Sequence, residues 1–474
     1  MGVTRTIARN TLSLAVVQFV SMLSTLVLSI ILARYLGEND YGIFVYSFAL
    51  ASLVFILADF GLGFLLVVEV SRDKESSSQY VVNTMFLRIL LGGVSIAIVA
   101  AVIVARGLSP LAGFAIIIVA ASTFFNSLLA VFTASFNAFE RMHYTLFTSL
   151  GERAFTVTVT IALVLMGFGL EYVVIVVLIG SIVNFLLAYG VYSKLISRIT
   201  ERISIRAATS QLKRAIPFGI AGMLLSTIYA VNTVLVGTLG GTEAAAVYGV
   251  GSNLAVTLMS LPGVFMSAML PVASQLYRSS MPMLSLLQQK TMKFLFALGL
   301  PLAIGVFFLG EEIILLLYGV NYAPAIGVFQ ILAVTIVIVF FNSGTGNVLA
   351  SADLMRLNTV SSVIGTAINL ALCALLIPPY GQYGAAVAFV SAFLIMAVTG
   401  QYFLRARVLK VDYKDIMIKP ILAGVGMSIA MLLTIEISVF LAADLGVVVY
   451  FAIFFALRTL GREDWEIIRN IFRR

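Results

Sequence analysis

Long runs of apolar residues, separated by short polar connections, dominate this chain of 474 residues. Most runs approach or exceed the roughly 20 residues that a helix needs to cross the hydrocarbon core of a bilayer. In lipid, the backbone groups must be paired within the protein, so only helices and closed barrels span a membrane. Runs such as 116–121 and 173–179 are continuously apolar and do not alternate as barrel strands would. The pattern therefore predicts transmembrane helices.

Fourteen such runs are present, which predicts an all-α integral membrane protein with 14 transmembrane helices. We expect these helices at 12–33, 41–68, 81–105, 111–139, 144–167, 172–192, 215–239, 244–276, 291–309, 323–350, 357–377, 384–404, 420–440 and 444–457. The first run is too long for a typical cleaved signal peptide, so we interpret it as the first span. The last hairpin has the least defined ends, because its final run is short and Glu436 lies near the end of the run before it.

A hydrophilic segment at 193–214 divides the chain into a six-helix lobe at 1–192 and a second six-helix lobe at 215–405. We interpret the segment itself as a basic cytoplasmic linker, and 406–474 as two extra helices and a basic cytoplasmic tail. Because each lobe has an even number of spans, the lobes form a parallel pseudo-repeat. The first outer turn of each lobe opens on Leu-Gly, at 36–37 and at 239–240. Transporters with such repeats bind substrate near the midplane between the halves.

Composition supports the membrane interpretation and limits which binding sites the chain can form. Hydrophobic residues make up 61% of the chain and charged residues 11%, and the mean hydropathy is +1.10. The single cysteine, Cys373, excludes an internal disulfide and a cysteine-based metal site. A net charge of +8 could suggest nucleic acid as a partner. The basic residues lie in the loops of one membrane face, however, which indicates contact with anionic lipid instead.

The distribution of the 29 lysines and arginines predicts the orientation of the chain. With a cytoplasmic N-terminus, Arg34 and Arg106 lie outside and Arg88 and Arg153 lie within helices, which leaves 25 on the cytoplasmic side. The opposite orientation would violate the positive-inside rule. We therefore expect both termini in the cytoplasm.

Signatures of enzymes are mostly absent from the sequence. There is no phosphate-binding loop of the GxxxxGK[ST] type, and we interpret the small residues at 344–346 as a site of close helix packing. The lone histidine, His143, is more typical of a surface residue than of a metal ligand. A membrane polymerase or ligase would expose a large outer loop, whereas every outer connection here is short. We expect a secondary transporter with no cofactor and no metal, and not an enzyme.

Charged residues at membrane depth are the first functional candidates. Arg88 and Arg153 lie about seven and nine residues inside their spans, roughly 10 and 14 Å deep. For Arg88, snorkelling to the surface is an equal alternative to a functional role, whereas Arg153 favours a cavity. Glu152 is expected to point away from Arg153, since adjacent helix residues diverge. Asp59 is expected either to pair with a cation of the protein or to bind a coupling ion, H⁺ or Na⁺.

Uncharged polar residues add Gln18, Asn232 and Asn253 as candidates for a hydrated substrate cleft. Hydrogen bonding between helices is the alternative for each of them. Arginines would bind a phosphate bidentately while keeping their charge, and amides would bind hydroxyl groups. Such a lining suits an anionic substrate that carries sugars.

Several segments resemble the Wzx-type polysaccharide flippases of the multidrug/oligosaccharidyl-lipid/polysaccharide (MOP) exporter superfamily. The similar segments are 32–37 followed by Tyr41-Gly42, 59–62, 270–277, 318–324, and Asn369 followed by 377–386. Two positions depart from the pattern of many relatives. Val67-Val68-Glu69 stands where they carry an arginine, and Asn232 stands where they carry an acidic residue. The second departure argues against coupling through a carboxylate at that position.

The resemblance implies two six-helix lobes and the transfer of a polyprenyl-diphosphate-linked oligosaccharide between leaflets of a prokaryotic plasma membrane. On that basis Arg88 and Arg153 would contact the diphosphate, and Gln18, Asn232 and Asn253 would line the path. The partners would be the lipid-linked glycan and membrane lipid, with glycan-assembly proteins and the oligomeric state left open. The alternatives are a cation-coupled multidrug exporter and a flippase for a peptidoglycan precursor.

Overall fold

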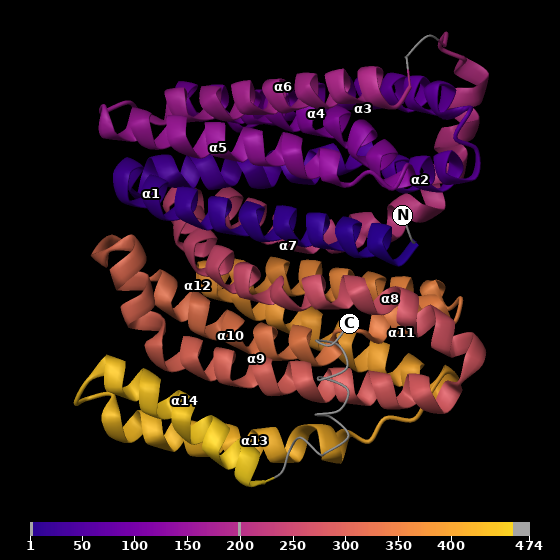
Figure 1. The fold of residues 1–474 in the computed structure, drawn as a ribbon. Coiled ribbons are helices and arrows are strands. Elements are labelled where there is room, and N and C mark those ends of the chain that lie inside the picture. Colours follow the sequence, from indigo (N-terminus) through magenta and orange to yellow (C-terminus); the bar gives the residue numbers. More distant parts are fainter. Residues whose placement is uncertain (1–2, 198–200, 458–474) are drawn as a thin grey trace. The chain divides into compact units, whose positions relative to one another are not determined.

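The computed structural model describes residues 3–197 and 201–457, and its regular secondary structure there is entirely helical (Figure 1). The helices are α1 (Val3–Asp59), α2 (Leu62–Arg72), α3 (Ser77–Arg106), α4 (Pro110–Ala138), α5 (His143–Leu165), α6 (Leu170–Leu195), α7 (Ile205–Met259), α8 (Leu261–Ser279), α9 (Met281–Tyr318), η1 (Val320–Tyr322), α10 (Ala325–Asn342), α11 (Thr345–Ser351), α12 (Met355–Arg407), α13 (Tyr413–Thr434) and α14 (Val439–Ala456). The predicted tail that ends in Arg473 and Arg474 lies outside the described residues.

Three long helices fold back on themselves at a glycine. The backbone leaves helical geometry at Gly37 in α1, at Gly241 in α7 and at Gly381 in α12. Residues before and after the first turn meet, since the hydroxyls of Ser29 and Tyr41 lie 2.6 Å apart. Eleven helices in the described chain are long and apolar enough to cross a membrane. Because three of them are hairpins, they amount to the fourteen spans that the sequence predicts.

The first hairpins of the two predicted lobes turn in the same way. Gly37 has φ 76° and ψ 176°, and Gly241 has φ 89° and ψ 175°. The sequence match between the turns had paired Gly37 with Gly240, so the structural equivalence is shifted by one residue. Only glycine enters this region of backbone space readily. The shared turn geometry supports an internal repeat.

Three predicted spans are broken within the apolar region, between α1 and α2, between α7 and α8, and between α10 and α11. The first break passes through Phe60 and Gly61, which have φ 39° and 79°. The third passes through Gly344, with φ 88°. A left-handed residue at Gly344 therefore interrupts the span that was expected to be continuous. The close helix packing expected of residues 344–346 is found at Gly344, because a Cβ atom there would lie 2.9 Å from side-chain atoms of Gln288 and Met266.

The chain forms two compact units, which we call unit 1 (Met1–Gly249 and Leu375–Ala385) and unit 2 (Val250–Ala374 and Ala386–Arg474). In unit 1, α1, α4 and α6 share a core that includes Phe55, Val119 and Val174. In unit 2, α9, α13 and α14 pack together, and the buried Tyr450 donates a hydrogen bond of 2.7 Å to the Ala297 carbonyl. The predicted lobe boundaries stay a prediction.

Two predicted connections are more helical than expected. The last ten residues of the predicted linker, 205–214, belong to α7, and Ala208 and Leu212 pack with Leu62 and Leu65 of α2. The last hairpin turns between Thr434 and Val439, so α13 and α14 begin earlier than the apolar runs indicated. Side chains of Asp412 and Ser438 cap these two helices at their N-termini. Capping thus moved both helix starts away from the hydropathy boundaries.

Candidate functional site

The break between α1 and α2 positions the first candidate site, in unit 1. Gly61 and Gly219 of α7 meet there without side chains between their backbones. A Cβ atom at Gly219 would lie 2.5 Å from the carbonyl carbon of Phe60, which is too close for any real contact. The two glycines therefore permit a direct backbone contact. This contact fixes the chain just beyond Asp59, the last residue of α1.

An ion pair between Asp59 and Arg88 of α3 lies at this break. The Arg88 guanidinium also donates to the Ser127 carbonyl of α4, and the Asp59 carboxylate accepts from the Gly63 backbone N–H at 3.4 Å. The pair thus connects α2, α3 and α4. The sequence prediction that Asp59 pairs with a cation of the protein agrees with this contact, and the alternative that Arg88 snorkels does not describe its buried position.

The burial of the two partners is unequal. The Arg88 side chain is 2% exposed, whereas the Asp59 side chain is 57% exposed. A guanidinium keeps its charge when it is buried, so Arg88 depends on its acceptors. Its Nε has no hydrogen-bond partner among the described residues. Arg88 therefore holds a spare donor, and the carboxylate that neutralises it remains accessible.

A groove of about 500 Å³ lies beside the ion pair. It is lined by Gly63, Phe64, Val67, Asn126, Leu129, Ala130, Thr133, Ala134 and Asn137, from α2 and α4. A Cβ atom at Gly63 would lie 3.2 Å from Arg88 Nη2 and 3.4 Å from Asp59 Oδ1. Because Gly63 has no side chain, nothing at that position separates the groove from the ion pair.

Polar side chains follow one face of α4 along this groove. Asn126, Thr133 and Asn137 are spaced so that they share that face over about 16 Å. Asn126 Nδ2 donates to Ser181 of α6 at 3.2 Å. Asn137 Oδ1 is buried with no partner among the described residues. The groove can therefore hydrogen-bond a hydroxylated ligand while the ion pair offers charge at one side of it.

The other predicted site residues lie in different surroundings. Gln18 is exposed on α1, and Asn253 is half-buried in the part of α7 that belongs to unit 2. Asn232 is fully buried and donates hydrogen bonds of 3.3 Å to the Tyr248 hydroxyl and to the Ala385 carbonyl. These bonds agree with the alternative that Asn232 connects helices. Of the predicted set, the structure brings Asp59 and Arg88 together.

Arg153 is half-buried on α5 and forms an ion pair with Glu152, at 3.4 Å between Nε and Oε2. The expectation that Glu152 points away from Arg153 is wrong for the charged groups. The Cβ atoms of the two residues diverge, but their long side chains bend toward each other. Glu152 also accepts a hydrogen bond of 3.0 Å from Thr156. Arg153 thus has an acidic partner of its own.

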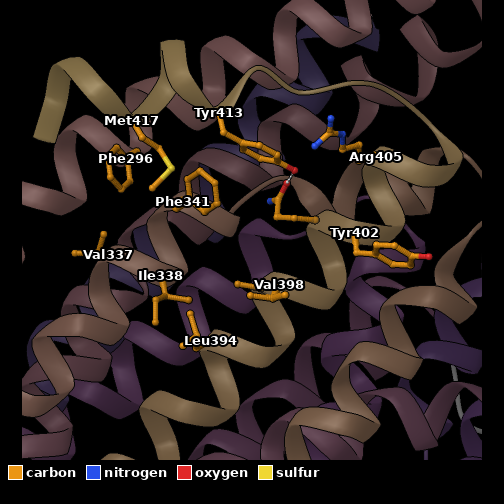
Figure 2. Close-up of a pocket in the computed structure, with 12 residues that line it drawn as sticks. Phe296, Val337, Ile338, Phe341, Leu394, Val398, Tyr402, Arg405, Tyr413 and Met417 are labelled. Carbon is orange, nitrogen blue, oxygen red and sulfur yellow. Dashed lines mark hydrogen bonds between the residues drawn. The ribbon is translucent and has the colours of Figure 1, made fainter.

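A second pocket, of about 490 Å³, lies in unit 2 between α9, α10, α12 and α13 (Figure 2). Its lining is mainly apolar, with Gln401, Tyr402, Arg405 and Tyr413 as the polar members. Gln401 donates to Thr345 at 2.8 Å and accepts from Tyr413 at 3.3 Å. Neutral hydrogen bonds therefore hold α12 and α13 against the start of α11.

Sequence reasoning missed the groove and most of its lining. The spacing of Asn126, Thr133 and Asn137 was a usable signal, because it repeats at helical intervals along one face. Gly63 and the Ser127 carbonyl carried no such signal. A small residue and a main-chain oxygen gain a role only when other helices approach them.

Comparisons with known proteins agree on the fold. Residues 7–277 match the model of a family described as polysaccharide biosynthesis protein. No curated protein sequence matches the chain. The structure is similar to that of the lipid II flippase MurJ in an inward closed conformation, with a TM-score of 0.77 and 15% identity over 95% of this chain and 99% of that chain.

Two further solved structures are similar. An inward-facing multidrug resistance transporter of the MATE family, within the MOP superfamily, matches with a TM-score of 0.68 and 16% identity over 83% of this chain and 98% of that chain. A MOP superfamily transporter from Pyrococcus furiosus matches with a TM-score of 0.60 and 16% identity, over 85% and 95%. At these identities the likeness establishes the fold of the superfamily.

Proposed function

The chain belongs to the polysaccharide biosynthesis protein family and is a multi-pass membrane protein, and from this we propose that it is a flippase. Its substrate is a polyprenyl-diphosphate-linked oligosaccharide, which it moves from the cytoplasmic to the outer leaflet of a prokaryotic plasma membrane. Both termini are cytoplasmic, as the distribution of lysine and arginine predicts. The protein acts by alternating access as a secondary transporter and carries out no chemical conversion.

The observation that carries this proposal is the pairing of a buried arginine with an exposed carboxylate beside a polar groove. In this proposal a diphosphate in the groove competes with Asp59 for Arg88, whose buried Nε has no hydrogen-bond partner among the described residues. The groove volume of about 500 Å³ lies within the roughly 300–1,000 Å³ of small-molecule sites. It therefore suits the diphosphate and the adjoining part of the glycan, and the amides of α4 suit hydroxyl groups.

Asp59 supplies the means of coupling in this proposal. While Asp59 neutralises Arg88, the charge of the guanidinium is already balanced and a second anion is not favoured. When Asp59 takes up H⁺ or Na⁺, its negative charge is cancelled and Arg88 needs another acceptor, which the diphosphate provides. Binding of the cation and of the substrate would then favour each other, as two ligands with a positive coupling free energy do.

The test is the leaflet location of the polyprenyl-linked glycan in cells that lack this protein. We expect the glycan to accumulate on the cytoplasmic leaflet and the surface polysaccharide to disappear, with both restored by the wild-type chain. Gly63→Val should lower flipping more than tenfold, because its side chain covers the ion pair. Gly93→Val is the matched control, since a Cβ atom at that α3 glycine meets nothing within 4 Å. Normal outer-leaflet glycan in the deletion strain would refute the proposal.

The exposed Asp59 carboxylate also favours a second candidate, a cation-coupled multidrug exporter. Drug-resistance assays separate the two, because an exporter would lower the drug sensitivity of the cells and leave the glycan distribution unchanged. A peptidoglycan-precursor flippase is tested by complementation of a strain depleted of its own. Rescue of growth in that strain would mean that the substrate is a cell-wall precursor and not a surface glycan.

A further inference from the structure

The pocket in unit 2 extends along one face of α12. Leu394, Val398, Gln401 and Arg405 follow one another at helical intervals and all line it. Leu394 and Arg405 are eleven positions apart, which corresponds to about 16 Å along the helix axis. That length is close to half of the roughly 30 Å hydrocarbon core of a bilayer. The pocket therefore has the depth of one leaflet.

The two ends of the pocket differ in character. Val337, Ile338 and Leu394 lie at one end, and Tyr402, Arg405 and Tyr413 gather at the other (Figure 2). Arg405 is exposed, and no carboxylate of the described residues lies within the 4.0 Å of an ion pair. A guanidinium without an acidic partner in the described part of the chain lies at one end, with aromatic hydroxyls beside it, and apolar side chains lie at the other end. This arrangement is complementary to a lipid at a bilayer interface, with its charged headgroup at the surface and its acyl chains in the hydrocarbon.

The segment that follows Arg405 strengthens the positive charge. Its basic residues are Arg407, Lys410, Lys414 and Lys419. Its acidic residues are Asp412, which caps α13, and Asp415, which pairs with Lys293 at 3.0 Å. The segment 405–419 thus carries more basic than acidic residues. Positive residues at the predicted cytoplasmic surface attract anionic headgroups.

We propose that this pocket holds one acyl chain of an anionic phospholipid of the cytoplasmic leaflet, whose phosphate binds Arg405. The phosphate accepts hydrogen bonds from the guanidinium, and the acyl chain lies between α13 and the face of α12 that runs to Leu394. This lipid is a bound component that stabilises the packing of α13. It is separate from the glycan lipid proposed as substrate, so the proposal does not rest on the flippase function.

The experiment measures lipid retention by the full-length chain with native mass spectrometry. The purified protein is titrated with phosphatidylglycerol and, separately, with phosphatidylcholine of the same acyl chains. We expect preferential retention of phosphatidylglycerol and about fivefold weaker retention by Arg405→Gln, the loss typical of one basic residue at an anionic interface. Arg356→Gln, at the start of α12, is the matched control, because Arg356 is also exposed but lies outside the pocket.

A second variant, Val398→Trp, fills the apolar chamber and leaves Arg405 in place. It should lower the retention of both phospholipids, and its unfolding temperature shows whether the variant is folded. Equal retention by Arg405→Gln and Arg356→Gln, or equal binding of the two headgroups, would mean a non-specific annulus and overturn the proposal. Displacement of phosphatidylglycerol by polyprenyl phosphate, dependent on Arg405, would assign the pocket to the substrate tail and overturn it as well.

Discussion

Two ion pairs with nearly the same burial lie in the two units of this protein. In unit 1, Arg88 is 2% exposed and Asp59 57%, and in unit 2, Lys293 is 7% exposed and Asp415 54%. Each pair combines a buried cation with an accessible carboxylate. Burial alone therefore does not distinguish the pair that we propose as part of the transport site from a structural contact.

The surroundings of the two pairs differ. Arg88 lies at a break between two helices, beside a groove, and bonds the Ser127 carbonyl as well as Asp59. Lys293 lies near the start of its apolar run and reaches the first turn of α13, where Asp415 is located. Its flexible stem can carry the ammonium toward the helix end if its partner is lost. What separates the two pairs is thus the depth of the cation, its second acceptor and the neighbouring groove, and we expect these features to decide which pair serves transport.

The largest expected effect comes from removing each carboxylate. Asp59→Asn should destabilise the protein by about 3 kcal/mol, because it leaves a guanidinium buried without its counter-charge. Asp415→Asn should cost no more than about 1 kcal/mol, since Lys293 can move to solvent. Thermal unfolding in one detergent measures both. Equal losses would mean that the surroundings of the pairs do not matter.

Replacing both partners by apolar residues separates stability from transport. Asp59→Ala with Arg88→Met should recover about 2 kcal/mol of what Asp59→Asn loses, because no unpaired charge remains. We expect flipping of the lipid-linked glycan to stay below a tenth of the wild-type rate. Lys293→Met with Asp415→Ala should keep the wild-type rate. Flipping by the first double variant would show that the Arg88–Asp59 pair only stabilises the fold.

Exchanging arginine and lysine gives the smallest effect. Arg88→Lys should cost about 1–2 kcal/mol, because an ammonium cannot span Asp59 and the Ser127 carbonyl in the fork geometry of a guanidinium. Lys293→Arg should change the stability by less than about 0.5 kcal/mol, as expected for a pair with an exposed partner. Unfolding temperatures of the two variants provide the comparison. If Arg88→Lys unfolded at the wild-type temperature, the fork geometry of the guanidinium would not contribute to stability.

The sequence predicted the fourteen spans because the length and hydropathy of a run are local properties, and they decide for each segment whether it crosses the bilayer. It also identified Asp59 and Arg88 as charged residues at membrane depth, where an unpaired charge is costly. Helix ends at Asp412 and Ser438 were missed, since capping does not follow hydropathy. The curled contact between Glu152 and Arg153 was missed because backbone direction does not fix the ends of long side chains.

By itself, the sequence therefore determined which segments are apolar helices and which charged residues need a partner, because the cost of burying a charge in lipid is a property of the residue. Only the tertiary structure decided that Asp59, 29 positions before Arg88, is that partner. It also decided that Gly63 leaves the pair open to the groove and that Gly61 meets Gly219. These contacts depend on which faces of separate helices pack together, and no local pattern specifies that choice.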